Sequence, residues 1–215
     1  MIGIYGGTFD PIHYGHLRPA LDVYQALPFS EIRFVPCGEP AHRGAPLTDA
    51  AHRLVMLRMA LANQAVFKID ERELHRKGPS YMVDTLKELR AECGKQSLSL
   101  ILGFDAFLGL ESWHQWQDIF KLAHLVVTHR PGWHKSKIER RPALKQMVDH
   151  RQMAGESLSQ YPAGGIAFIA VTQLDISSTL IRELIMAGKD VRYLLPDNVY
   201  ELIKQEKLYN YYVRT

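Results

Sequence analysis

The sequence predicts an α/β fold, with a doubly wound, mostly parallel sheet and a C-terminal helical tail. Short β-rich runs recur along the chain and longer helical patterns follow most of them, an alternation typical of parallel sheets. Two runs, LSLILG at 98–103 and AHLVVTHR at 123–130, are almost continuously apolar, as expected for central strands buried on both faces. The last strand candidate ends at 171, and only helical patterns follow it.

Each element follows from these patterns. We expect strands at 2–5, 31–36, 67–70, 98–103, 123–130 and 165–171, and helices near 15–27, 48–63, 80–92, 177–190 and 196–209. Thr48 or Asp49 would cap the second helix, and Gly188 would lie in the turn between the last two helices. The stretch from about 130 to 160 is expected to be irregular.

Composition and charge indicate a soluble globular protein. The 215 residues are 47% hydrophobic and 23% charged, which is ordinary for such a protein, and a single domain over 1–215 is the default expectation. The net charge is only +3, and the densest basic stretch, 134–145, includes a glutamate and has no interleaved aromatics. We therefore read that stretch as a solvated loop or helix face and expect no nucleic-acid partner.

The cysteines and the hydropathy pattern point to the cytoplasm. Cys37 and Cys93 lie far apart and form no CxxC motif, so a disulfide framework or a cysteine metal site is disfavoured and a reducing compartment is expected. No apolar run approaches the roughly 18 residues of a membrane span, and the first apolar stretch lacks a basic leader. We expect a cytoplasmic protein without a membrane partner.

The segment GGTFDPIHYGH at 6–16 occupies the first strand-to-helix turn, where open parallel sheets usually bind phosphate. Gly6 and Gly7 let the backbone approach a ligand, and the helix that follows offers N–H groups and a positive dipole end to an anion. His13 and His16 stand three apart at the mouth of this helix, where both imidazoles can donate hydrogen bonds to phosphate oxygens. The segment predicts a phosphate site.

Other interpretations of this segment remain open. It matches neither the dinucleotide fingerprint GxGxxG nor the P-loop pattern GxxxxGK[ST]. Either histidine alone would more often be a helix cap or a partly exposed surface group. A zinc site would need a third ligand, and Asp10 would have to reach across Pro11 to supply it. For Asp10 itself, an Asx-type turn before Pro11 and a direct contact with the ligand are equally good readings.

Two separated segments resemble the signatures of the nucleotidyltransferase superfamily. GGTFDPIHYGHL resembles its GxFxPxHxGH signature, and ISSTLIR at 176–182 resembles its second signature, ISSTxIR. PSYMVDTL, LGFDAFLGLESWHQW and HRPGW extend the likeness along nearly the whole chain, most closely to the bacterial nicotinate-nucleotide adenylyltransferases. The resemblance implies a Rossmann-like fold, and a C-terminal helical part, 176–215, that carries the second signature.

The resemblance also implies an activity. The family transfers the adenylyl group of ATP to nicotinate mononucleotide, which gives deamido-NAD and pyrophosphate in NAD biosynthesis, by in-line attack without a covalent enzyme intermediate. The attacking phosphate monoester is largely ionised at pH 7, so no protein base is needed. Mg²⁺ would accompany ATP, and because the sequence has no acidic cluster, substrate oxygens and water would hold most of it. We assign no metal ligand to the chain.

The resemblance places both signatures in one ATP site. His16, with His13 beside it, would donate to the phosphates in the transition state, and Arg182 would hold a phosphate of the leaving group. A plain serine N-cap is the alternative for either serine of the second signature. The residues expected to bind ATP are Gly7, Thr8, Phe9, His13, His16, Asp105, Ile176, Ser177, Ser178, Thr179 and Arg182.

Nicotinate mononucleotide would occupy a neighbouring site. Trp113 is the leading candidate to stack on the cationic pyridinium ring, and N–H groups near Tyr81 would suit its carboxylate. The residues expected there are Gly6, Arg43, Tyr81, Asp84, Thr85, Trp113, His114 and Arg130. The chain departs from the family at Arg43 and Met82, where lysine and threonine are common.

The sequence leaves other functions open for this chain. A related nucleotidyltransferase could act on nicotinamide mononucleotide or phosphopantetheine, and a nucleotide-binding sensor could keep the fold without turnover. The sequence also leaves a homo-oligomer open.

Overall fold

The sheet is parallel and doubly wound. The computed structural model describes residues 1–41, 46–129, 136–172 and 174–211. In this described part, one sheet of six parallel strands runs in the order β4-β2-β1-β6-β7-β8: β1 is Ile2–Gly7, β2 Glu31–Pro36, β4 Phe67–Ile69, β6 Leu98–Gly103, β7 His124–His129 and β8 Ile166–Ala170. From β1 the sheet extends through β2 and β4 in one direction and through β6, β7 and β8 in the other, so the predicted topology is confirmed.

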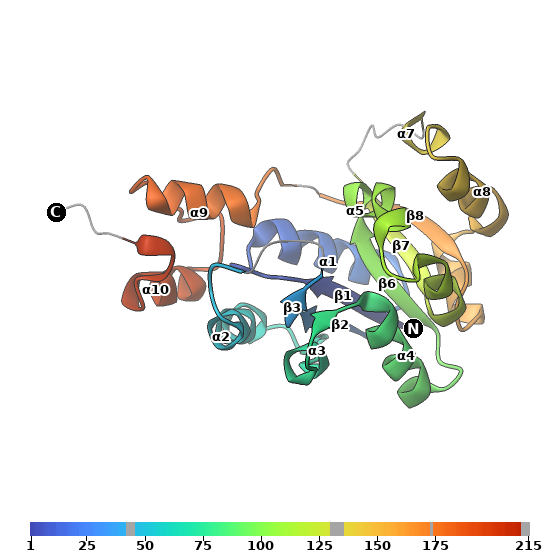
Figure 1. The fold of residues 1–215 in the computed structure, drawn as a ribbon, viewed down its shortest axis with the longest axis horizontal. Helices are drawn as coiled ribbons and strands as arrows, with labels where there is room; N and C mark the ends of the chain where they lie inside the picture. Colours follow the sequence, from blue (N-terminus) through green and yellow to red (C-terminus); the bar gives the residue numbers. More distant parts are fainter. Residues whose placement is uncertain (42–45, 130–135, 173, 212–215) are drawn as a thin grey trace.

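Helices cover both faces of this sheet (Figure 1). They are α1 (Tyr14–Ala26), α2 (Ala50–Leu61), α3 (Arg72–His75), α4 (Met82–Cys93), α5 (Phe104–Leu108), α6 (Ile119–Leu122), α7 (Ser136–Glu139), α8 (Pro142–Arg151), α9 (Ser178–Met186) and α10 (Asp197–Gln205). Short 3₁₀ helices are η1 (Leu110–Ser112), η2 (Trp116–Asp118), η3 (Gly155–Gln160) and η4 (Leu208–Asn210), and β3 (Glu39–Pro40) pairs with β5 (Pro79–Ser80) in a separate two-stranded sheet.

The strands divide their side chains between two hydrophobic clusters. Ile101 of β6 and Val126 of β7 join the cluster formed with α1, α2, α9 and α10. Their neighbours Leu100, Leu102 and Leu125 join the cluster formed with α4, α5, α6 and α8. Because successive strand residues point to opposite faces, the nearly continuous apolar runs predicted for these strands reflect burial on both sides.

The expectation of an irregular stretch from about 130 to 160 is wrong for its described part. Residues 136–160 contain α7, α8 and η3. Pro142 begins α8, and Leu144 and Val148, four apart on one helix face, are buried at 0% and 5% exposure. Many charged residues in this segment hid the apolar spacing that indicates an amphipathic helix.

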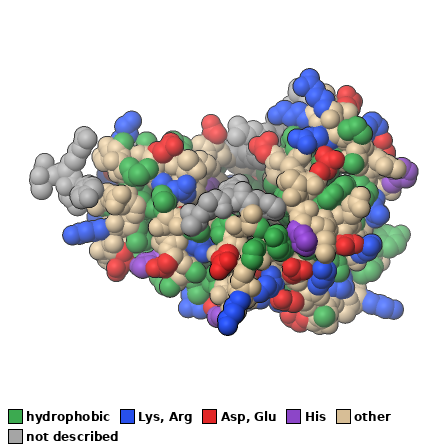
Figure 2. Space-filling model, in the orientation of Figure 1, with side chains coloured by type: hydrophobic (Ala, Val, Ile, Leu, Met, Phe, Trp, Pro, Cys, Tyr) green, Lys and Arg blue, Asp and Glu red, His purple; other side chains and the backbone are tan. Residues whose placement is uncertain are grey.

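The surface of this segment agrees with its expected solvated character. Lys137, Arg140, Arg141 and Lys145 are exposed, and Figure 2 shows Lys and Arg side chains over α7 and α8 with acidic side chains among them. Among the residues that the structure describes, no helix is both long and apolar enough to cross a membrane.

The last two helices lie together at one end of the molecule (Figure 1). Asn198 at the start of α10 donates a hydrogen bond through Nδ2 to the carbonyl of Met59 in α2 at 2.7 Å. Asp49 caps α2 as predicted, since its side chain accepts a hydrogen bond from the N–H of His52 at 2.9 Å. The C-terminal helices therefore extend the cluster on the α1 and α2 face beyond the sheet.

Candidate functional site

Two neighbouring cavities lie at the carboxyl end of β1, beside the point where the strand order reverses. The smaller has a volume of about 330 Å³ and the larger about 860 Å³. Both have walls formed by Gly6, Gly7, Thr8, Met82, Ala106 and Trp113. Because these residues face both spaces, a ligand in one cavity would lie directly beside a ligand in the other.

The larger cavity brings together segments that are far apart in sequence. The end of β1, the start of α1, α5 and the N-terminus of α9 all contribute to its lining. Its lining includes each residue that the sequence assigns to ATP: Gly7, Thr8, Phe9, His13, His16, Asp105, Ile176, Ser177, Ser178, Thr179 and Arg182. The structure thus brings the two signatures to one site, while the contacts these residues make with a nucleotide stay predictions.

The two histidines of the first signature stack on each other in this cavity. Their ring centroids are 3.8 Å apart with an interplanar angle of 29°, and Phe9 meets His16 edge-on at 5.2 Å. His13 is only 3% exposed, and burial lowers its pKa to about 4. Its imidazole is therefore neutral at pH 7 and has one N–H to donate.

His13 should make the folded protein sensitive to mild acid. Its imidazole protonates near pH 6.5 in the unfolded chain but only near pH 4 in the folded protein. Between these values the unfolded state binds a proton that the folded state does not, so the free energy of unfolding falls as the pH falls, by about 1.4 kcal/mol per unit. We expect His13→Gln to lose this component when urea unfolding is measured at pH 5 and pH 7.

The exposed His150 in α8 supplies the control for that measurement. His150→Gln should keep the wild-type pH dependence, because its imidazole lies at the surface. An equal pH dependence in the wild type and in His13→Gln would show that His13 titrates normally in the folded protein.

Of the two helices that carry the signatures, α9 rather than α1 has an N-terminus open to an anion. In the first turn of α1, the N–H of Tyr14 donates to the carbonyl of Leu194 at 3.1 Å, and the N–H of His16 donates to the carbonyl of His13 at 2.9 Å. The expected supply of N–H groups at α1 is therefore largely used within the protein. At α9, the N–H groups of Ser178 and Thr179 have no acceptor among the described residues, and both residues line the larger cavity.

The two serines of the second signature have different roles. Ser177 is the N-cap of α9, and its hydroxyl accepts a hydrogen bond from the N–H of Leu180 at 3.1 Å. Ser178 instead donates to the carbonyl of Pro11 in the first signature at 3.0 Å. The plain N-cap reading is thus right for Ser177, whereas the hydroxyl of Ser178 joins the two signatures.

Arg182 also joins the two signatures. Its Nη1 donates to the carbonyl of Asp10 at 2.7 Å and its Nη2 to the hydroxyl of Thr179 at 3.3 Å. A guanidinium carries five N–H donors, so donors remain for a ligand in the cavity.

The two signatures also approach each other closely at Gly15. A Cβ on Gly15 would lie 2.7 Å from the carbonyl of Ile176, and only glycine allows this approach of the two segments.

Arg182→Ala should chiefly weaken nucleotide binding. Losing a hydrogen bond to a charged phosphate costs about 1.5–3 kcal/mol, so we expect the KM for ATP to rise about 10- to 100-fold while the KM for the acceptor stays nearly constant. Steady-state kinetics with each substrate varied in turn measures this split. Arg192→Ala, which removes an exposed arginine paired with Asp190, is the control, and a lowered melting temperature with unchanged ATP kinetics would point to a packing role instead.

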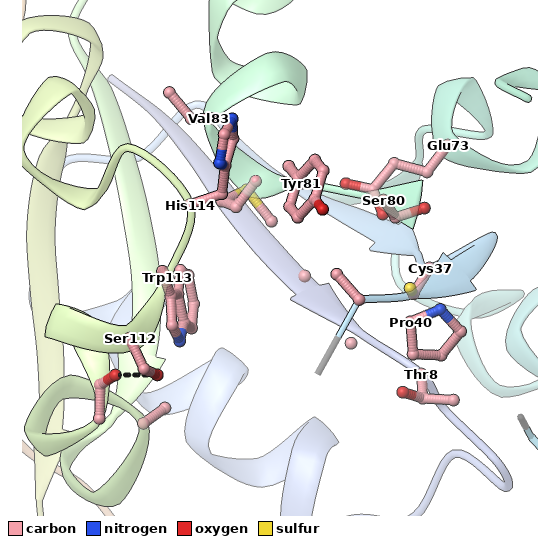
Figure 3. A pocket seen from close by; sticks show the side chains of 16 residues that line it. Thr8, Cys37, Pro40, Glu73, Ser80, Tyr81, Val83, Ser112, Trp113 and His114 are labelled. Atoms are coloured by element: carbon pink, nitrogen blue, oxygen red, sulfur yellow. Dashed lines mark hydrogen bonds between the residues drawn. The ribbon is translucent and has the colours of Figure 1, made fainter. Parts of the chain in front are cut away.

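Aromatic side chains from two segments surround the smaller cavity. Figure 3 shows Trp113 at one end, the rings of Tyr81 and His114 together, and Ser80, Glu73 and Cys37 toward the other end. The Tyr81 and His114 ring centroids are 4.5 Å apart. Tyr81, Trp113, His114 and Gly6, four of the residues assigned to nicotinate mononucleotide, line this space.

Two other assigned residues do not reach either cavity. Thr85 is fully buried, donates through its hydroxyl to Glu73 at 2.6 Å and accepts from Arg76 at 3.1 Å. Asp84 forms an ion pair with Lys87 at 3.2 Å on the outside of α4. Both were assigned from their place near the start of α4, but successive helical residues point in different directions, and neither of these two lines a cavity. Arg43 and Arg130 lie outside the described residues.

Sequence reasoning missed several residues at this site. Cys37, Glu73 and Ser80 line the smaller cavity, together with Met82, which the sequence had marked only as a departure from the family. Beneath the larger one, Arg53 of α2 is 1% exposed and donates to the carbonyl of Thr8 at 2.8 Å. An arginine inside the apolar pattern of the second predicted helix was the one available signal, because a buried charge needs polar partners.

The donor set does not form a metal cage. Within the described ranges, no three His, Cys, Asp or Glu side chains converge on one point. The carboxylate of Asp10 accepts from the N–H of Leu47 at 2.9 Å and from the hydroxyl of Tyr209 at 2.7 Å. Both carboxylate oxygens are therefore bonded to residues far along the chain, and the hydrogen bonds of the described residues include no Asx turn at Asp10.

A parallel sheet with a cavity at its reversal point, beside the N-terminus of α9, and a second cavity along the same wall is the arrangement of a nucleotide-binding protein of the α/β class. The sequence profile described as cytidylyltransferase-like matches residues 4–184. A curated relative from Methylococcus capsulatus, named "Probable nicotinate-nucleotide adenylyltransferase", is 52% identical over 97% of this chain and 99% of its own length. A relative of the same name from Halorhodospira halophila is 50% identical over 98% of this chain and 95% of its own.

The chain belongs to the cytidylyltransferase-like family, and within it to the group of the nicotinate-nucleotide adenylyltransferases. A solved structure titled "Plasmodium falciparum nicotinic acid mononucleotide adenylyltransferase complexed with NaAD" superposes with a TM-score of 0.74 over 98% of both chains, at 19% identity. At that identity the likeness concerns the fold, and it supports the Rossmann-like assignment.

Proposed function

We propose that this protein transfers the adenylyl group of ATP to nicotinate mononucleotide, giving deamido-NAD and pyrophosphate. The observation that carries the proposal is the wall shared by the two cavities. Direct transfer between two nucleotides requires both to be held at once with the attacking phosphate next to the α-phosphate, and Gly6, Gly7 and Thr8 line both spaces. The names of the curated relatives support the same reaction.

Residues of the larger cavity would stabilise the charge that moves toward pyrophosphate. His16 and neutral His13 would each donate a hydrogen bond to the phosphates, and the N–H groups of Ser178 and Thr179 would bind a phosphate oxygen at the N-terminus of α9. Arg182 would hold the leaving group from the same side. The nucleophile arrives ionised, so in-line attack needs no base and no covalent enzyme intermediate.

Mg²⁺ would act together with the triphosphate. It would neutralise charge on the phosphates, and because the described side chains supply no cage, substrate oxygens and water would provide most of its ligands. The chain's own contribution is to orient the triphosphate between α9 and the histidine pair.

A pyrophosphate-release assay with ATP and a panel of acceptors tests the proposal. Nicotinate mononucleotide, nicotinamide mononucleotide, phosphopantetheine and no acceptor should be compared, with the dinucleotide product identified by mass. We expect the highest kcat/KM with nicotinate mononucleotide. A preference for phosphopantetheine would assign a different transferase, and ATP binding without turnover on any acceptor would identify a sensor.

The proposed setting is a reducing one. Cys37 and Cys93 are free thiols, which favours a compartment such as the cytoplasm. Besides ATP and nicotinate mononucleotide, the proposal needs no partner.

A further inference from the structure

Asp10 lies at the centre of a buried set of hydrogen bonds beside the larger cavity. It is 3% exposed. Its carboxylate accepts from the hydroxyl of Tyr209 at 2.7 Å and from the N–H of Leu47 at 2.9 Å, and its carbonyl accepts from Nη1 of Arg182 at 2.7 Å. One residue of the first signature therefore connects η4, the segment before α2, and the arginine of the second signature.

Without these hydrogen bonds, the carboxylate of Asp10 would weaken nucleotide binding in the larger cavity. It lines the cavity proposed to bind a triphosphate, and a carboxylate facing a polyanion would repel it. The hydroxyl of Tyr209 and the N–H of Leu47 instead satisfy the two carboxylate oxygens on the side of the C-terminal turn. This arrangement leaves the carbonyl of Asp10 to fix Arg182.

Tyr209 is well placed to maintain this orientation. It is 7% exposed, and it lies in η4, which packs against α9. Burial, together with the charge of Asp10, raises its pKa far above the ordinary value of a tyrosine. Its hydroxyl therefore keeps its proton and remains a donor to Asp10 at any physiological pH.

We propose that Tyr209 is a positioning residue for nucleotide binding, which acts through Asp10 to hold the guanidinium of Arg182 toward the phosphates. The inference rests on the proposed binding of ATP. It goes further because it assigns part of the binding energy to Tyr209, which does not line the larger cavity and bonds to Asp10 in its wall.

Direct binding of a non-hydrolysable ATP analogue, measured by calorimetry without acceptor, tests this role. Tyr209→Phe removes only the hydroxyl, and we expect the Kd to rise about 5- to 20-fold, less than for the direct loss of a hydrogen bond to a charged group, because Tyr209 acts on the nucleotide only through Asp10 and Arg182. Tyr211→Phe is the matched control, since it removes a neighbouring hydroxyl bonded to Tyr200 at 3.1 Å, and its Kd should stay within about twofold of wild type.

The pathway through Arg182 is tested by a double-mutant cycle. In an Arg182→Ala background, Tyr209→Phe should change the Kd by less than about twofold, because the group it positions is absent. An unchanged Kd in Tyr209→Phe alone, whatever its melting temperature, would assign Tyr209 to stability and overturn the inference. Additive effects in the double variant would also overturn it.

A measurement on the unaltered protein covers the case in which Tyr209→Phe does not fold. Coupling between sites is reciprocal, so binding of the analogue should slow hydrogen exchange at the N–H of Leu47, which bonds to the same carboxylate. Unchanged exchange at Leu47 in the bound protein would contradict the inference. Failure of the wild type to bind the analogue would overturn the proposed function together with it, whereas binding without turnover would overturn only the function.

Discussion

We expect His16→Ala to lower kcat by about 10²- to 10⁴-fold while changing the KM of either substrate much less. The imidazole stacks on His13 at 3.8 Å inside the larger cavity, where a hydrogen bond to the phosphates would strengthen as charge moves onto the departing oxygens. An interaction that is stronger in the transition state than in the ground state appears in kcat and not in KM. Steady-state pyrophosphate release, with each substrate varied in turn, measures both parameters.

Two controls separate this role from a structural one. His150→Ala removes an exposed histidine of α8 and should leave both parameters unchanged. The melting temperature of His16→Ala reports any loss of packing against Phe9. If turnover survives within about threefold, His16 is a structural residue and the proposed transition-state contact does not exist.

The second large effect should be a preference for the acid over the amide. The N–H groups of Met82, at the start of α4, and of His114 have no acceptor among the described residues. A carboxylate accepts from such donors, whereas a carboxamide brings an NH₂ that needs an acceptor. One mismatched polar group costs about 1–3 kcal/mol and lost charge-assisted bonds add to it, so kcat/KM should favour nicotinate mononucleotide by at least about 10²-fold.

Trp113→Ala separates stacking from this discrimination. Loss of the indole face should weaken both substrates while leaving most of their ratio intact, because a ring face does not distinguish the two substituents. Trp116→Ala is the control, since Trp116 packs on Phe120 and lines neither cavity. A ratio that collapses in Trp113→Ala would place the discriminating contacts on the tryptophan segment.

Near-equal wild-type values for the two substrates would also be informative. Glu73 lines the other end of the smaller cavity (Figure 3), and its carboxyl group accepts a hydrogen bond from Thr85. It is the kind of acceptor that a carboxamide requires. If the enzyme accepts the amide as well as the acid, Glu73 rather than the N–H group of Met82 would be the group that binds the substituent of the pyridine ring.

The strands of the sheet could be predicted from the sequence because burial on both faces gives them short, nearly uninterrupted apolar runs. The strands β6 and β7 are buried at nearly every position and contain the apolar runs LIL and LVV. The cap of α2 was placed at Thr48 or Asp49 from the side chains alone, and Asp49 supplies it. The helix at 142–151 was missed although Leu144, Met147 and Val148 follow helical spacing and pack on one cluster. The charged and polar residues around these three positions weaken the periodic signal of so short a helix.

The site residues that belong to the two signatures were predicted correctly as cavity residues. Those whose role depends on where a side chain points along a helix were not. The residues assigned to ATP lie together because the first signature connects β1 to α1 and the second forms the N-terminus of α9. Thr85 and Asp84 were assigned by proximity to Tyr81, yet Thr85 lies behind the cavity wall, bonded to Glu73, and Asp84 pairs with Lys87. Tyr209 could not be found from the sequence, because its contact with Asp10 spans 199 positions and no local pattern encodes so distant a pair.

The bonds that join the two signatures have a consequence for how the protein is made. Asp10 and Arg182 are 172 positions apart, so the ribosome synthesises the histidine pair long before the arginine that completes its pocket. At about 5–20 residues per second, the N-terminal signature waits on the order of ten seconds or more for its counterpart. A nascent chain released early would already contain most of the sheet, but it would lack the α9 N-terminus and Arg182, so the capacity to bind nucleotide should arise only in chains whose synthesis has passed these residues.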